Sequence, residues 1–201
     1  MYGVLLSQTN TGSDAELACV FATPLSVTSN MPESISDTLN LRRIGSGQGV
    51  QRWEIQATIA DSADGVDFFM LNITAGRSKK LYIRMPRLLR NTYTPSGQNP
   101  QSLANHGAGS TAISVTGMSN LQKGEFIQFA THSKVYAVAG YANGVISIFP
   151  ALTAYVPIGT VIKYGDNVTL HAKLDDSAVV GITYEDGILA RPGQYKFLEA
   201  L

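Results

Sequence analysis

Three side chains that could carry out acyl transfer stand next to one another between two apolar runs: His132, Ser133 and Lys134. A nucleophilic serine needs a base within hydrogen-bond reach, a group that orients this base, and donors for the oxyanion. Neighbours on a tight turn rarely point at one another, and no orienting carboxylate can be identified. We therefore interpret the trio as a turn and predict that the chain is not an enzyme. A cell-wall hydrolase with His132 as its base is the alternative.

The histidines and the cysteine do not have the spacings of a metal site. His106 and His171 are distant from His132 in the sequence, and none of them belongs to an HExxH pattern. The single cysteine, Cys19, excludes an internal disulfide and a cysteine-based zinc site, and we interpret it as a small buried hydrophobe. We predict no metal and no cofactor.

Four acidic residues form a second cluster that could hold a hard cation. They lack the twelve-residue loop of alternating oxygen ligands that binds calcium, so we interpret them as solvated turn charges or as one half of an interface. They are Asp175, Asp176, Glu185 and Asp186.

Two stretches could contact phosphate. Residues 45–49, "GSGQG", are not followed by GK[ST], and we interpret them as a hairpin loop that joins residues 39–44 to the next strand. Residues 77–90, "RSKKLYIRMPRLLR", contain no acid and would attract DNA phosphates if they lined a pore. The alternative is that these cations pair with acids of a neighbouring subunit or face water. The cations are Arg77, Lys79, Lys80, Arg84, Arg87 and Arg90.

The composition is typical of a folded chain that assembles with others. The 201 residues are 44% hydrophobic, enough for one good core or two modest ones. Fifteen basic and fifteen acidic residues leave no net charge to steer the chain toward nucleic acid or anionic lipid. Only 15% of the residues are charged, which favours a surface that partners cover.

The amino terminus and the apolar runs do not indicate secretion or a membrane span. The first residues lack the basic region of a signal peptide, and no apolar run approaches the roughly 20 residues that cross a bilayer. We expect no membrane partner, and synthesis and residence in a cytoplasm or in a particle assembled there.

The first half of the chain predicts a compact α+β unit. Apolar and polar residues alternate through residues 51–60, which indicates a strand with one buried face. Residues 61–76 predict a helix that lies on the sheet, because Val66, Phe69, Met70 and Ile73 share one face. Residues 81–85 alternate as another strand.

The second half predicts a separate β unit. Residues 89–109 are rich in turn formers and predict a linker. Short strands then follow one another, with hairpin turns at Asn143-Gly144 and at residues 165–167, which indicates a small barrel or sandwich. We favour an OB-like barrel over residues 110–179. Residues 180–201 carry an apolar face that needs a sheet to join. The predicted first domain is therefore discontinuous, residues 1–88 plus 180–201, with the barrel inserted into it.

Several of these motifs, taken in order, resemble one family of phage proteins. The strand with "QRWEI", the capped helix and "LYIRMP" resemble the ring-forming domain of phage tail-tip proteins. "KGEFIQFATHSKVYAVAGY" with "ISIFPAL" resembles the inserted OB-like barrel of the distal tail protein of long-tailed bacteriophages, and "QYKFLEAL" is similar to that family's final strand. The likeness covers roughly residues 39–201. It rests on the order of the motifs and on the insertion of one domain into the other, not on any single motif.

The resemblance implies a mainly β (α+β) fold, with a ring-forming β-sandwich domain, one helix and an inserted OB-like barrel. It also implies a structural virion protein of the tail tip or baseplate, assembled in the host cytoplasm. Such a protein forms a hexameric ring that joins the tail tube protein to hub, fibre or receptor-binding proteins, with DNA passing through the lumen. The interface residues implied are Gly45, Gly47, Gly49, Arg52, Arg77, Lys79, Lys80, Arg84, Tyr195 and Phe197.

Two other functions stay open. One is a wedge or hub component in the baseplate of a contractile-tailed phage. The other is a binding module whose barrel recognises a carbohydrate or an oligonucleotide, although its tyrosines have no basic groove interleaved with them.

Overall fold

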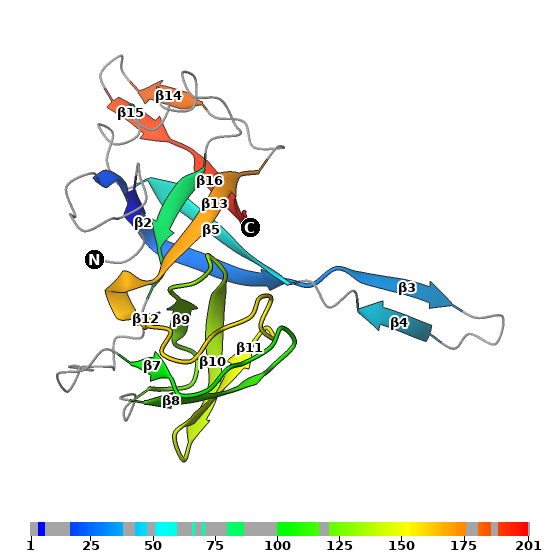
Figure 1. Ribbon diagram of the computed structural model, residues 1–201. Coiled ribbons are helices and arrows are strands. Elements are labelled where there is room, and N and C mark those ends of the chain that lie inside the picture. The colour runs from blue at the N-terminus through cyan, green and yellow to red at the C-terminus, as the bar shows by residue number, and fades with distance from the viewer. Residues whose placement is uncertain are drawn as a thin grey trace.

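The computed structural model shows a mainly β protein built around two six-stranded sheets (Figure 1). It describes residues 4–6, 17–37, 43–47, 51–59, 66, 70, 80–86, 100–116, 121–175, 181–185 and 189–200.

One sheet closes on itself into an antiparallel barrel. Its first strand, β1, pairs with both β2 and β6, which closes the circle. The sequence predicts a β-sandwich here, whereas the six strands form one continuous closed sheet. In their order around the barrel they are β1 (Val4–Leu6), β2 (Leu17–Asn30), β5 (Arg52–Ile59), β16 (Gln194–Glu199), β13 (Thr169–Leu174) and β6 (Leu81–Arg84).

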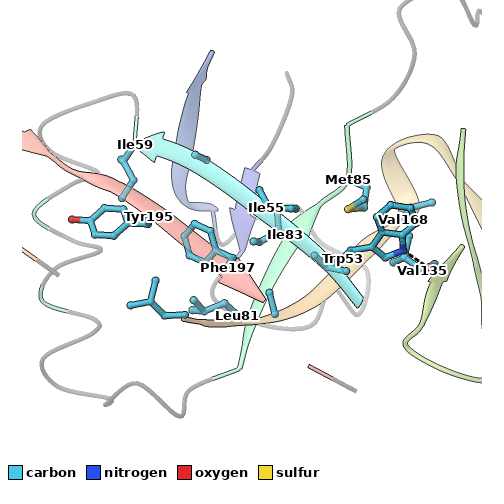
Figure 2. Close-up of a cluster of buried hydrophobic side chains, with 14 residues drawn as sticks. Trp53, Ile55, Ile59, Leu81, Ile83, Met85, Val135, Val168, Tyr195 and Phe197 are labelled. Atoms are coloured by element: carbon cyan, nitrogen blue, oxygen red, sulfur yellow. Dashed lines mark hydrogen bonds between the residues drawn. The ribbon is translucent and has the colours of Figure 1, made fainter. Parts of the chain in front are cut away.

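The alternation in residues 51–60 produces the expected buried face. Trp53, Ile55, Ala57 and Ile59 on β5 are all buried, and their side chains fill the barrel from one wall. Figure 2 shows Ile55 and Ile59 near aromatic and aliphatic side chains of β6 and β16, and Trp53 near Val135 and Val168. Removing this apolar surface from water is the main force that closes the barrel.

The other sheet lies between β6 and β13 in the chain and has its own apolar core. Its edges are linked, because Ser102 N–H donates to Thr160 O and Ile162 N–H donates to Pro100 O. Its strands, in spatial order, are β12 (Ile162–Tyr164), β9 (Phe126–Phe129), β10 (Val135–Ala142), β11 (Val145–Phe149), β8 (Ala112–Thr116) and β7 (Gln101–Ser102).

The hairpin predicted at Asn143-Gly144 is confirmed. It joins β10 to β11, where Ala142 pairs with Val145. The two turn residues have φ of 51° and 75°, the left-handed values that a two-residue turn between twisted strands requires. The turn predicted at residues 165–167 is also present, as a short 3-10 helix, Gly165–Asn167.

Two small hairpins lie outside both sheets. One pairs β3 (Glu33–Asp37) with β4 (Arg43–Gly47), and the other pairs β14 (Ile182–Glu185) with β15 (Leu189–Pro192). The β3–β4 hairpin projects away from the barrel as an arm (Figure 1). The interpretation of residues 45–49 as a loop is wrong for residues 45–47, because Gly45 and Gly47 lie within β4, paired with Ile35 and Glu33. Residues 48–49 lie outside the described residues.

Two other expectations about strands and linkers are corrected. Residues 168–174 were expected in the second unit, but β13 pairs with β6 and β16 and completes the barrel. Residues 100–109, expected as part of a linker, contain the edge strand β7 of the second sheet and an isolated bridge between His106 and Val156. Residues 89–99 lie outside the described residues.

Of the predicted helix, residues 61–76, only Val66 and Met70 are described, and both are helical. Val66 is 37% exposed and Met70 is 51% exposed, and the rest of the predicted helix lies outside the described residues. No helix among the described residues has the length and apolar character to span a bilayer.

We expect Phe197→Ala to lower the free energy of unfolding by about 3–5 kcal/mol, because it leaves a cavity in the barrel core. Chemical denaturation followed by circular dichroism measures this change. Gln194→Ala, on the exposed start of the same strand, is the control and should cost less than about 0.5 kcal/mol. Equal losses in the two variants would contradict the placement of Phe197.

Candidate functional site

The amine of Lys134 lies in the interface between the two sheets. Lys134 belongs to the connection between β9 and β10 and is 1% exposed. Its Nζ donates to the main-chain oxygen and to Oε1 of Gln51, at 2.7 and 2.8 Å, and to Oε2 of Glu199 at 2.5 Å. Gln51 directly precedes β5 and Glu199 ends β16, so two strands of the barrel hold this lysine of the second sheet.

The carboxylate of Glu199 accepts hydrogen bonds from both sheets. Besides Lys134, its Oε2 accepts the main-chain N–H of Trp53 at 2.9 Å, and its Oε1 accepts that of Val135 at 3.4 Å. The side chain is 0% exposed. Hydrogen bonds to a charged group are strong where water is excluded, and a buried carboxylate needs several of them.

The indole of Trp53 adds a second connection between the sheets. Its Nε1 donates to Val135 O at 2.8 Å, the bond drawn in Figure 2. Its ring packs edge-on against Phe126 and Phe149, with centroids 5.3 and 6.4 Å away. Trp53 therefore satisfies its polar atom and buries its apolar ring in one place.

Gln128, on β9, makes a third connection. Its Nε2 donates to Ser133 O at 2.7 Å and to Thr169 O at 3.0 Å, and Thr169 belongs to β13 of the barrel. We call Gln51, Trp53, Gln128, Lys134 and Glu199 the junction cluster. Within the described part of the chain, every buried side-chain polar atom has a partner, so the cluster is fully satisfied.

His132, Ser133 and Lys134 are adjacent in the chain but bond to different partners. Lys134 enters the junction, Ser133 offers its carbonyl to Gln128, and His132 turns toward Tyr136. The connection between two strands agrees with the interpretation of this segment as a turn.

Both ring nitrogens of His132 have partners other than Ser133. Nε2 bonds with Tyr136 Oη at 2.8 Å, and Nδ1 bonds with Thr131 Oγ1 at 3.1 Å. The Tyr136 hydroxyl also accepts the N–H of Thr153 and bonds with its Oγ1. This network fixes the orientation of the His132 ring, and burial lowers the pKa of the ring.

The other two histidines lie elsewhere. His106 Nε2 accepts the N–H of Ser114 at 3.2 Å, and His171 packs edge-on against Tyr82. Burial lowers the pKa of both. Over the described ranges, no group of three or more histidine, cysteine or acidic residues is arranged to hold a metal ion.

The acidic cluster is described only in part. Asp175 lies 3.8 Å from Lys196 Nζ, and Glu185 ends β14. Lys196 also pairs with Glu54. Asp176 and Asp186 lie outside the described residues, and so does the side chain of Cys19.

The predicted interface residues fall in different places. Arg52 is an exposed residue of β5 that pairs with Glu54, Lys80 is exposed, and Arg84 is half-buried on β6. Tyr195 and Phe197 lie in the barrel core, 1% and 0% exposed, so they stabilise the barrel from within and cannot contact a neighbour directly. Gly45 and Gly47 lie in the arm. Gly49, Arg77, Lys79, Arg87 and Arg90 lie outside the described residues.

Glu54 shows how the surface of β5 is held. Burial alone would raise the pKa of Glu54, but hydrogen bonds from Lys196, Asn30 and Arg52 outweigh this and lower it. The carboxylate therefore stays charged and ties β2 and β16 to β5.

Sequence reasoning missed Gln51, Gln128 and Glu199. The available signal was polarity inside apolar runs, since Gln128 interrupts "FIQFA" and Glu199 interrupts "FLEAL". A buried polar side chain needs a partner, but the sequence does not say which distant residue supplies it.

Comparison with models of known protein families found no match to this chain, and comparison with curated proteins found none either.

We expect Lys134→Met to lower the free energy of unfolding by about 3–5 kcal/mol, because Glu199 becomes a buried charge without its cation. Adding Glu199→Gln to this variant should restore part of the loss, because the charge is then removed. Chemical denaturation at neutral pH measures both. Lys163→Met removes an exposed lysine and is the control. If Lys134→Met lowered the free energy of unfolding no more than Lys163→Met does, the result would contradict the role given to the buried pair.

The ring of His132 should titrate below its ordinary value of 6.5, because the fold favours the neutral form. Stability is then complete above about pH 6.5 and falls as the pH drops toward the folded-state pKa, since the unfolded chain binds the proton more readily. NMR titration gives the midpoint. His132→Gln should make the free energy of unfolding less dependent on pH between about 7 and 5, and an unchanged dependence would oppose this.

Proposed function

We propose that the chain is a structural virion protein of a phage tail tip, related to the distal tail proteins. In this proposal, its copies close into a hexameric ring that joins the tail tube to hub, fibre or receptor-binding proteins. The ring lumen lets DNA pass, and the protein resides in the virion. A wedge or hub role in a contractile baseplate is the closest variant of the same proposal.

Two features support the proposal. The order of the sequence motifs resembles that family. In addition, strands from both halves of the chain share one barrel, and the second sheet arises from a single excursion between β6 and β13. We propose that the barrel corresponds to the ring-forming sandwich domain, and that the second sheet, whose edges are linked, corresponds to the OB-like domain.

The observation that carries the assembly argument is the β3–β4 arm. A two-stranded hairpin alone in water is marginally stable, and its outer edges offer unpaired main-chain groups. The barrel closes its own edges, so the arm is the part that gains most from a neighbour. A closed ring covers every arm, because each copy receives one arm and gives one.

Part of the proposed interface lies on the arm or next to it in the chain. Gly45 and Gly47 lie on it, and Arg52 begins the barrel strand that follows it. Lys80 directly precedes β6 of the barrel, and Arg84 is its last residue. These two are the members of the basic run, residues 77–90, that the structure describes. We propose that these residues contact the next copy or face the lumen.

Native mass spectrometry tests this assembly, on the chain alone and with its tail tube partner. We expect a sixfold species in at least one condition. The decisive variant shortens the arm by replacing residues 36–44 with Asn-Gly, because Ile35 and Gly45 are cross-strand partners that a two-residue turn can join.

The shortened variant should stay folded, with barrel stability within about 1 kcal/mol of the parent, and lose the ring. Ile158→Ser, at an exposed position of the second sheet's loops, is the control and should keep the ring. A strict monomer in both conditions, or a ring that still forms in the shortened variant, would count against the proposal.

A second candidate is a binding module for a carbohydrate or oligonucleotide. It is favoured by Tyr155, which is 55% exposed and offers a ring for stacking. Saturable micromolar binding on a glycan array or to single-stranded DNA, abolished by Tyr155→Ala, would support it; no binding in either assay would end it.

A further inference from the structure

The junction cluster contains the three groups that an amide bond between side chains requires: an amine, a carboxamide and a carboxylate. Lys134 Nζ lies 2.8 Å from Oε1 of Gln51 and 2.5 Å from Oε2 of Glu199. All three side chains are buried. Groups held at contact distance in a dry site react as if at very high concentration.

The amine has a route to its reactive, neutral form. Burial lowers the pKa of Lys134, although Glu199 opposes this shift. Proton transfer along the hydrogen bond from Nζ to Glu199 supplies the neutral amine that the attack requires.

The carboxamide is also held in place. Gln51 Nε2 donates to Ser29 Oγ at 3.1 Å, while Oε1 accepts from the lysine. Ser29 lies on β2 of the barrel, so the amide is held between a barrel strand and Lys134 of the second sheet. The carbonyl carbon is one bond beyond Oε1, the atom that accepts the hydrogen bond from Nζ.

We propose that Lys134 and Gln51 join in an isopeptide bond, with Glu199 moving the protons. Nζ attacks Cδ of Gln51 and forms the new C–N bond, and the bond from Cδ to Nε2 breaks. Nζ gives up two protons: one leaves with Nε2 as ammonia, and the other stays on Glu199. The products are an amide, ammonia and a neutral carboxyl, with no oxidant or cofactor involved.

Gln51 is the acyl donor, and Glu199 is not. A carboxylate resists attack by an amine, because it is an anion with no good leaving group. A carboxamide loses ammonia, which diffuses out and makes the step irreversible. The bond would join positions 83 residues apart and tie the second sheet covalently to the barrel.

The test is the intact mass of the purified, folded protein, measured again after prolonged incubation at neutral pH. We expect a loss of about 17 Da, the mass of ammonia. Trypsin should then release residues 44–52 joined to residues 124–163, because a modified Lys134 is not cleaved. Fragment ions distinguish Gln51 from Gln48 in the first peptide.

Three variants complete the test, each checked for folding by circular dichroism. Lys134→Arg and Glu199→Gln should keep their full mass, whereas Lys163→Arg should show the loss. Full mass in the folded parent protein overturns the proposal. A loss of about 18 Da that maps to Glu199 overturns the choice of Gln51, and a loss that persists in Glu199→Gln overturns the role of Glu199.

Discussion

A positive charge withdrawn from water at the meeting of two sheets constrains the rest of this structure. When the two sheets first meet, the ammonium of Lys134 is stable there only because Glu199 and Gln51 supply oxygen atoms from the barrel. Breaking such a pair costs several kcal/mol, far more than separating a pair at the surface. The two sheets therefore have one preferred orientation, because any other would leave a charge without its partner.

The hydrophobic contacts around the pair act in the same direction. Trp53 belongs to the barrel core and yet donates to the main chain of β10, and its ring contacts aromatic residues of the second sheet. Apolar packing alone tolerates small slides between surfaces, whereas hydrogen bonds with fixed partners do not. The combination therefore holds the two sheets together in one defined orientation.

The sequence predicted what depends on local pattern. The alternation in residues 51–60 gave β5 and its buried face, and Asn143-Gly144 gave a turn, because both follow from geometry within a few residues. It failed where pairing is long-range. Nothing local distinguishes β13 from the strands before it, yet β13 pairs with β6 and β16. Likewise, Glu199 is one polar residue in an apolar run, and only the fold brings it to a lysine 65 positions away.

The barrel also imposes a sequence of events on folding. The strands from β7 to β12 are contiguous in the chain and can pair as soon as they leave the ribosome, whereas the barrel needs β16, the last strand. Until β16 is synthesised, β1, β2, β5 and β6 cannot close the barrel, so their edges are unpaired and their apolar face is exposed. Chains in such a state tend to associate incorrectly. During synthesis, the second sheet would thus be finished first and would offer Lys134 as the fixed point on which Glu199 docks last.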